Sequence, residues 1–159
     1  MQKNKTALMT AAELLARQEQ SSNHLRRKLL AKKYSATEID SAIETLQERN
    51  YLNDEETCRQ QFEYLYSENK LSVRQICAKL IQRGFDSEFV KSLIPDDSDE
   101  RELKVASYAL GKNFSKINFD VDDKEKFKLK QKIYRHLAMK GFNSEIISVA
   151  MENFFESVN

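Results

Sequence analysis

The chain is poor in the residues that interrupt helices and build tight turns. Among its 159 residues there are three Gly, one Pro and no Trp. Gly and Pro are the strongest breakers of regular structure, so their scarcity leaves little room for hairpins between short strands. A hydrophobic content of 40% with 32% charged residues is typical of a globular chain. We therefore expect an all-α protein.

Residues that assemble metal and nucleophile sites are scarce as well. There are two Cys and two His, and neither a CxxC pair nor two His at metal-ligand spacing occurs. The sequence also has no Gly-rich phosphate loop, no HExxH motif and no nucleophile elbow. We therefore expect no enzyme, no metal and no cofactor, and we expect Cys58 and Cys77 to be buried core thiols.

Long apolar stretches are missing too. The most apolar stretch, Ile146–Met151, is about six residues long, whereas a helix that crosses a bilayer needs roughly 20. We expect no membrane-spanning segment.

The formal net charge of +1 conceals a segregation of charge along the chain. Residues 24–33 carry five basic side chains and no acid, whereas Asp96–Glu102 carries five acids and one Arg. A segment with charges of one sign affects the choice of binding partner more than the net charge of the whole chain does.

A pattern of apolar and basic positions occurs three times, as Leu25–Tyr34, Ile76–Phe85 and Ile133–Phe142. Leu25 and Ile76 are 51 residues apart, and Ile76 and Ile133 are 57 apart. Periods of this size indicate stacked supersecondary units that cannot bury their apolar faces alone. The equivalent positions are Leu25, Ile76 and Ile133, then Lys28, Lys79 and His136, then Leu29, Leu80 and Leu137, then Lys32, Arg83 and Lys140, and last Tyr34, Phe85 and Phe142.

Each copy ends in a pattern that predicts helix, tight turn and helix. The turn position holds Lys33, Gly84 or Gly141, and a capping residue follows shortly after it. A left-handed residue favours Gly at that position, so Lys33 is expected to cost some turn stability. Further caps are predicted at Ser21, Ser35, Asn53 or Asp54, Ser72 and Asp122, in several cases with Glu or Gln three residues later.

We expect three three-helix modules, at residues 7–50, 51–95 and 96–159, forming an elongated, curved tandem repeat. The first helix is predicted to end near Gln20. The repeat helix of the third module is predicted to run from Phe127 or Lys128 to Lys140, after an irregular connection over Gly111–Asp123.

Basic side chains recur on the second helix of every module. In the third module they lie at i, i+4 and i+7, on the side opposite the apolar stripe. Such a face can meet phosphates or an acidic protein surface, although any solvated helix carries Lys and Arg. The candidate partner-binding residues are Arg26, Arg27, Lys79, Arg83, Lys128, Lys132 and Arg135.

An aromatic residue follows the turn in each repeat, namely Tyr34, Phe85 and Phe142. Exposed aromatics could stack on nucleic-acid bases. Residues just beyond a left-handed turn commonly pack back on their own helix, so we favour the interpretation that all three are core residues.

Several short segments carry a motif series that is hard to obtain by chance. An LLARxExS pattern within Ala12–Ser21 is followed by LRRKL at Leu25–Leu29 and by YLNDE at Tyr51–Glu55, and Ile76–Phe85 continues the series. Together these segments resemble the RecX family of regulatory proteins, over about Ala7 to Phe155. Lys33 and Asn50 stand where the family tends to have Gly, and Leu71-Ser72 replaces a Gly-containing turn.

The resemblance implies a cytoplasmic bacterial modulator of the RecA recombinase, usually an inhibitor. Proteins of this kind are built from tandem three-helix modules, lie in the groove of the RecA filament on DNA, and lower its ATPase and strand-exchange activities without chemistry of their own. The implied partner is the RecA filament, with weak contact to DNA phosphates, no membrane and a monomeric regulator. The alternative is a nucleic-acid-binding helical module that acts through its basic helices without a recombinase.

Overall fold

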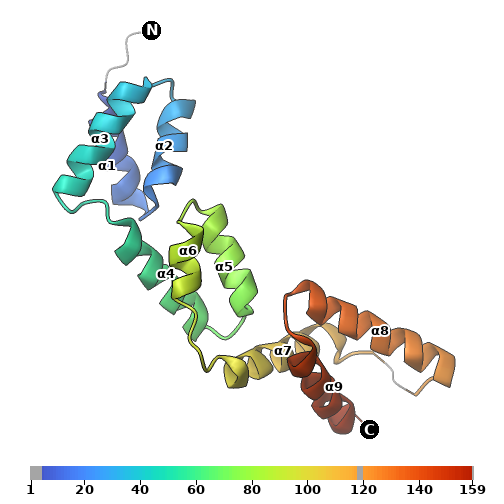
Figure 1. Ribbon diagram of the computed structural model, residues 1–159. Coiled ribbons are helices and arrows are strands. Elements are labelled where there is room, and N and C mark those ends of the chain that lie inside the picture. Colours follow the sequence, from blue (N-terminus) through green and yellow to red (C-terminus); the bar gives the residue numbers. More distant parts are fainter. Residues whose placement is uncertain (1–4, 118–119, 159) are drawn as a thin grey trace. The chain divides into compact units, whose positions relative to one another are not determined.

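A computed structural model describes residues 5–117 and 120–158 of the chain, and over these residues it contains nine α-helices and no strand. Figure 1 shows them in chain order. The all-α class predicted from the sequence is confirmed. The helices are α1 (Ala7–Arg17), α2 (Ser22–Ala31), α3 (Ala36–Glu48), α4 (Asp54–Ser67), α5 (Val73–Gln82), α6 (Ser87–Ser92), α7 (Asp99–Phe114), α8 (Asp123–Met139) and α9 (Ser144–Val158).

The chain divides into two compact units. The N-terminal unit contains the described residues up to Phe62 together with Lys79–Leu93. The C-terminal unit contains Glu63–Ala78 and the described residues from Ile94 onward. Helices α4 and α5 therefore contribute residues to both units. Each of the ranges 7–50, 51–95 and 96–159 contains three of the helices. The boundaries between the three modules remain a prediction.

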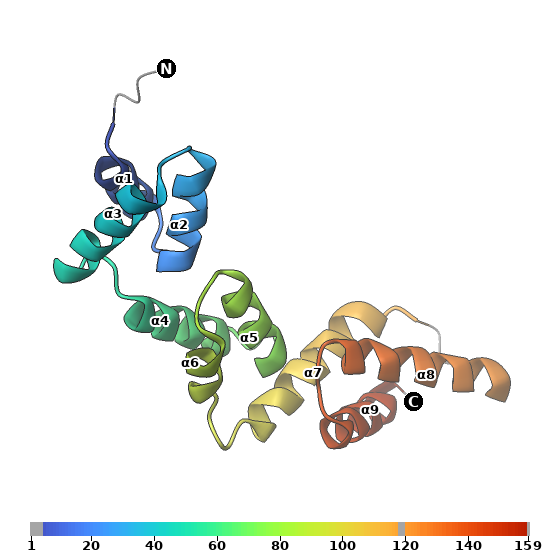
Figure 2. The same ribbon diagram turned by 45° about the horizontal axis from the view of Figure 1, so that its top comes forward.

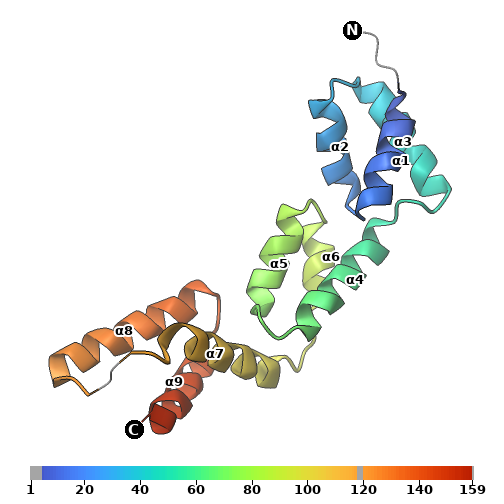
Figure 3. The same ribbon diagram turned by 180° about the vertical axis from the view of Figure 1, so that it is seen from behind.

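In the N-terminal unit, α1, α2 and α3 pack on one another, with α1 lying beside α3 (Figure 3). Their apolar stripes meet in a core that includes Ala11, Leu25, Leu29, Ile39 and Leu46. Burying such stripes is the main source of stability for short helices, which are marginal by themselves.

In the C-terminal unit, α7 packs mainly against α9, and α8 contacts both (Figure 2). The core of this unit includes Ala106, Leu110, Ile133, Leu137 and Ile147, each 0% or 1% exposed. Ile146, Ile147 and Ala150 of α9 are buried in this core, and Met151, Phe154 and Phe155 pack against it partly buried.

Equivalent positions of the three repeats are buried alike. Leu25, Ile76 and Ile133 are 0% exposed, as are Leu29, Leu80 and Leu137. The three turn aromatics are also buried, at 7% for Tyr34, 5% for Phe85 and 6% for Phe142, which confirms their interpretation as core residues. Cys58 and Cys77 are buried as expected.

The predicted helix caps are formed by the expected side chains. Ser35 and Glu38 make a complete capping box at α3, and Ser72 and Gln75 make the reciprocal pair of bonds at α5. The carboxylate of Asp122 accepts from the Glu125 amide at the start of α8. These bonds satisfy amides that the first turn of a helix leaves without partners.

The left-handed turn residues are also as expected. Lys33 has a φ of 63°, next to 92° for Gly84 and 89° for Gly141 at the equivalent positions. Asn50, with a φ of 56°, ends α3 in the same way. Asn69, at 52°, is a left-handed residue that the sequence interpretation did not identify.

Three helix boundaries differ from prediction. Helix α1 ends at Arg17, not near Gln20, because Gln18 is extended and the Gln20 side chain donates to the carbonyls of Leu14 and Gln18. Helix α7 continues through Gly111 to Phe114, since Leu110 and Phe114 prolong its buried stripe. Helix α8 begins at Asp123, four or five residues earlier than predicted, because Asp122 caps it.

We predict that Leu29→Ala, Leu80→Ala and Leu137→Ala each lower the free energy of unfolding by about 2–5 kcal/mol, because each removes a fully buried side chain and leaves a cavity. Urea denaturation measures the loss. Leu30→Ala is the matched control, since Leu30 is adjacent to Leu29 and 50% exposed. Equal losses for Leu29 and Leu30 would contradict the packing described here.

We predict that Lys33→Gly leaves stability unchanged or raises it by up to about 1 kcal/mol, because Gly adopts a positive φ without the clash of a Cβ atom. Lys32→Gly is the control. Lys32 has a φ of −86°, so Gly there adds only backbone entropy to the unfolded chain and should destabilise. Thermal melting of both variants checks the pair, and a lower melting temperature for Lys33→Gly would refute the prediction.

Candidate partner-binding site

Two of the three second helices that carry the basic residues, α2 and α5, are positioned by buried serines at their N-caps. In the N-terminal unit, Ser21 is 0% exposed. Its Oγ accepts from the amide of His24 at 3.1 Å and donates to the carbonyl oxygen of Arg83 at 2.6 Å. One hydroxyl thus caps α2 and binds the chain just after α5.

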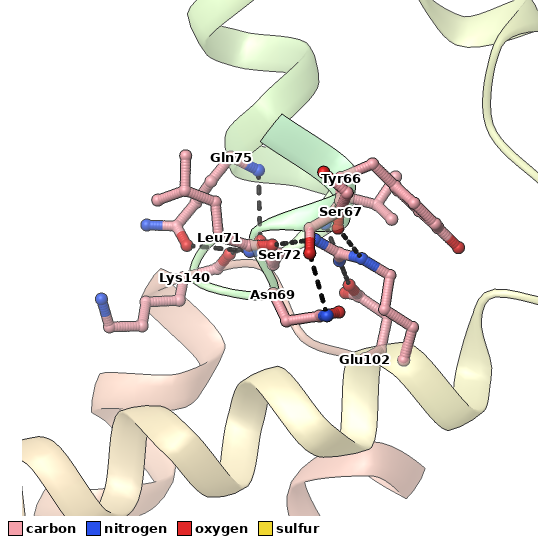
Figure 4. Close-up of polar contacts among 10 residues, drawn as sticks. Tyr66, Ser67, Asn69, Leu71, Ser72, Gln75, Glu102 and Lys140 are labelled. Carbon is pink, nitrogen blue, oxygen red and sulfur yellow. Dashed lines mark hydrogen bonds and ion pairs between the residues drawn. The ribbon is translucent and has the colours of Figure 1, made fainter. Parts of the chain in front are cut away.

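The C-terminal unit repeats this arrangement at α5 and α8. Ser72 is also 0% exposed; its Oγ accepts from the amide of Gln75 at 3.1 Å and donates to the carbonyl oxygen of Lys140 (Figure 4). Ser21 and Ser72 occupy equivalent positions four residues before Leu25 and Ile76, as Arg83 and Lys140 are equivalent at the other end. The same bond therefore joins consecutive second helices in each unit.

The two turn glycines are needed for close approach as well as for their positive φ. A Cβ at Gly84 would lie 2.7 Å from Ser21 Oγ, and one at Gly141 would lie 2.7 Å from Arg74 Cβ. Both distances are shorter than nonbonded atoms tolerate. Lys33 stands at the equivalent position of α2 and is exposed, so its side chain has room.

The four candidate basic residues of the N-terminal unit differ in their surroundings. Arg26 forms an ion pair with Asp40 of α3, and Arg83 Nη1 donates to Gln61 Oε1 at 2.6 Å. Arg27 is exposed, although its Nη2 donates to the carbonyl of Gln82 at 3.3 Å. Lys79 is exposed on α5. Arg83 therefore helps hold the unit together, whereas the Arg26–Asp40 pair lies at the surface and adds little stability, and Arg27 and Lys79 are exposed.

His24 lies beside this basic group, with Nδ1 3.2 Å from Arg27 Nη2. Burial lowers the pKa of His24 below its usual value, and the positive charges of Lys28 and Arg27 lower it further. The imidazole is therefore neutral at pH 7, and its Nδ1 can accept from the guanidinium.

The three candidate residues of the C-terminal unit share the exposed face of α8. Lys128, Lys132 and Arg135 are all exposed, while Ile133 and Leu137 on the opposite side are fully buried. No ion pair of these three cations is found among the described residues. This is the most accessible basic surface among the candidates, and we call it the α8 basic face.

Two exposed aromatic rings on α8 lie next to the α8 basic face and were not identified from the sequence. Phe127 is 62% exposed and Tyr134 is 45% exposed. Their spacing of seven residues places them on one side of the helix, and that periodicity was the available signal. Tyr64 and Tyr108 of the same unit are exposed as well, at 64% and 46%, so what distinguishes Phe127 and Tyr134 is their position beside three cations.

A buried ion pair on α7 is a further feature that the sequence interpretation missed. Arg101 and Glu102 are 8% and 9% exposed, and Arg101 Nη1 donates to Glu102 Oε1 at 2.9 Å. Arg101 also donates to the carbonyls of Tyr66 and Leu71, and its guanidinium lies 4.1 Å from the centre of the Tyr66 ring. The sequence contained one signal for this ion pair, because Arg101 is the one basic residue in the acidic segment that begins at Asp96.

Glu102 joins α7 to the start of α5 (Figure 4). Its Oε1 accepts from the amide of Val73 at 3.0 Å. Burial raises the pKa of Glu102 above its usual value, whereas the Val73 amide and Arg101 act in the opposite direction. The bonds offset part of the free energy that the charge loses when it leaves water.

No cluster of three or more His, Cys, Asp or Glu suited to a metal ion occurs among residues 5–117 and 120–158. Within the same residues no helix combines the length and hydropathy needed to span a bilayer. What the described surface offers is charge and exposed aromatic area, which suit binding.

Comparison with known proteins gives consistent matches. Residues 119–151 match the family model described as RecX, third three-helix domain. The "Regulatory protein RecX" of Neisseria meningitidis serogroup A is 30% identical over 157 residues, covering 98% of this chain and 95% of that protein. The protein of the same name from Clostridium beijerinckii is 27% identical over 142 residues, covering 87% of this chain and 63% of that one.

Solved structures share the fold. The crystal structure of RecX from Lactobacillus salivarius has a TM-score of 0.71 at 17% identity and covers 92% of this chain and 93% of its own. A second crystal structure, of a regulatory protein RecX, has a TM-score of 0.73 at 14% identity and covers 92% of this chain and 70% of its own.

We predict that Glu102→Ala lowers the free energy of unfolding by about 3–5 kcal/mol, because it leaves Arg101 buried without its counter-charge and the Val73 amide without its acceptor. Chemical denaturation measures the loss. The control is Glu100→Ala, which removes an exposed i, i+4 pair with Lys104 on the same helix and should have a much smaller effect. Similar losses for both variants would show that the buried pair has no special role.

Proposed function

Because the chain belongs to the RecX family of regulatory proteins, we propose that it binds the RecA recombinase filament on DNA and inhibits its ATPase and recombination activities without catalysing a reaction. The observation that carries the proposal is the match to a relative named as a regulatory protein over 98% of this chain and 95% of that one. A regulator acts by binding, and the described residues offer binding surfaces.

The α8 basic face is the part of the molecule best suited to the filament. A recombinase filament presents DNA phosphates and repeating protein surfaces, both of which can attract Lys and Arg side chains. Lys128, Lys132 and Arg135 extend over two turns of one helix, so they can engage several acceptors at once. Arg27 and Lys79 add a second basic surface, on the N-terminal unit.

Repetition supports binding to a repeating partner. Equivalent second helices present basic residues in each repeat, and a filament presents equivalent sites along its length. Several weak contacts made by one chain combine into strong binding, because every contact after the first is intramolecular.

A second candidate function is binding of single-stranded nucleic acid without a recombinase. The observation that favours it is the pair of exposed rings, Phe127 and Tyr134, beside the α8 basic face. Aromatic rings next to cations are the usual means of holding unpaired bases. Tight binding of the isolated protein to single-stranded DNA at physiological salt would support this candidate over the first.

We predict that reversing Lys128, Lys132 and Arg135 together to Glu severely weakens inhibition of the RecA ATPase on single-stranded DNA and leaves the fold intact, because the three side chains are exposed. Inhibition by the wild type should weaken with added salt, since salt screens these contacts. The assay is a titration of the ATPase with each protein at two salt concentrations.

The control for this experiment is the triple reversal of Lys104, Lys112 and Lys116, which are exposed on α7 or just after it and change the net charge equally. It should inhibit nearly as well as the wild type. If the folded α8 variant inhibits as strongly as the wild type, the α8 basic face is ordinary solvated surface and the contact lies elsewhere.

A further inference from the structure

The N-terminal unit contains a pocket of about 470 Å³ that none of the candidate basic residues lines. It is formed by the end of α1, the turn after α3 and the first turns of α4. Its volume lies within the range of sites that hold a ligand or a partner's side chains. The lining residues are Ala12, Leu15, Ala16, Glu19, Gln20, Leu46, Asn50, Tyr51, Leu52, Asn53, Glu56, Thr57 and Gln60.

The pocket has an apolar floor and an apolar side that an incoming group can reach. Leu46 and Leu52, each 3% exposed, belong to the core of the unit and form the base. Ala12 and Ala16 are exposed on α1 and, with the half-buried Leu15 between them, form an apolar side of the pocket. This α1 side, rather than the buried floor, offers accessible apolar surface to a partner's side chain.

The charged groups in the lining are all negative. Glu19 and Glu56 are both exposed carboxylates, and the lining contains no Lys or Arg. Helix α3 ends at the pocket with no basic residue in its last turn, and the C-terminal ends of helices carry partial negative charge; Arg17 in the last turn of α1 offsets the end of that helix. Helix α4 begins there, but three acids in its first turn offset its positive end. The pocket thus favours a cation.

A buried acceptor in the lining has no partner. Gln20 is 7% exposed, and its Nε2 donates to the carbonyl of Leu14 at 3.1 Å and to that of Gln18 at 3.3 Å. Two carbonyl partners require the amino group, so the orientation of the amide is determined. Its Oε1 is buried and makes no hydrogen bond within the described residues. Buried acceptors are normally paired, so an N–H donor would stabilise this oxygen if a shift of the lining gave the donor access to it.

We infer that this pocket receives a Lys or Arg side chain of the protein partner, together with an apolar side chain next to it. The alkyl part of a basic side chain packs on apolar surface while its charged end stays polar, which suits an apolar side with acidic groups around it. Tyr51, 70% exposed at the rim, adds the kind of aromatic surface that is enriched in protein interfaces. DNA phosphates would be repelled by Glu19 and Glu56.

The inference rests on the proposed function, since the partner protein is the recombinase. It adds that the N-terminal unit holds the partner by an acidic and apolar pocket, while the α8 basic face of the C-terminal unit is of opposite charge. The two surfaces would then recognise different chemical groups of one filament.

Two variants test the pocket. Ala16→Phe fills it from an exposed position of α1, and the pair Glu19→Gln with Glu56→Gln removes its charge while keeping side-chain shape. The controls are Ala36→Phe, at an exposed Ala of α3 outside the lining, and Glu152→Gln with Glu156→Gln, at exposed acids of α9. All five proteins, including the wild type, are titrated into the RecA ATPase assay on single-stranded DNA, and circular dichroism melts check folding.

We expect both pocket variants to need at least about tenfold more protein for half inhibition, and both controls to stay within about twofold of the wild type. If Ala16→Phe lowers the melting temperature strongly, the Gln pair decides. If the wild type inhibits and the folded pocket variants inhibit equally well, the pocket inference is wrong and the proposed function stands. Absence of any effect of the wild type on RecA would overturn both.

Discussion

The structure depends on one hydrogen bond that occurs twice, from a buried N-cap serine to the carbonyl at the end of the next second helix. Ser21 donates to Arg83 and Ser72 donates to Lys140. Each hydroxyl also accepts from an amide of its own helix, so its donor and acceptor functions are both used at a position with no access to water. The bond requires the two chain segments to touch, and Gly84 and Gly141 allow this because a Cβ at either would clash.

Arg101 and Glu102 are further buried polar residues whose charged groups have partners. The guanidinium of Arg101 has Glu102, two carbonyls and the Tyr66 ring around it, and Glu102 also holds the Val73 amide. Burying ions adds little net stability, but leaving one of them unpaired is costly, so such a pair admits few alternative arrangements. In the C-terminal unit it determines how α7 meets the segment between α4 and α5, a relation that apolar packing alone would define less sharply.

The basic residues of the two units differ in their contacts and in their exposure. Arg83 is engaged by Gln61 within the N-terminal unit, and Arg26 forms a surface ion pair with Asp40. The α8 basic face is exposed, and the opposite side of the same helix is buried in the core. The charged groups of the pocket in the N-terminal unit, Glu19 and Glu56, have the opposite sign to those of the α8 basic face.

The sequence by itself determined the helical class, the three-fold repeat, the buried positions from Leu25 to Phe142, the caps and the left-handed Lys33, because each of these depends on residues close together in the chain. Tertiary structure alone decided that Ser21 and Ser72 make a second bond, that Arg101 is buried, that Arg26 and Arg83 are engaged within their unit, and that a pocket forms beside Gln20. These features depend on which segments meet in space, as with Ser72 and Lys140, 68 residues apart. A sequence pattern over a few neighbouring residues cannot predict a contact between segments so far apart in the chain.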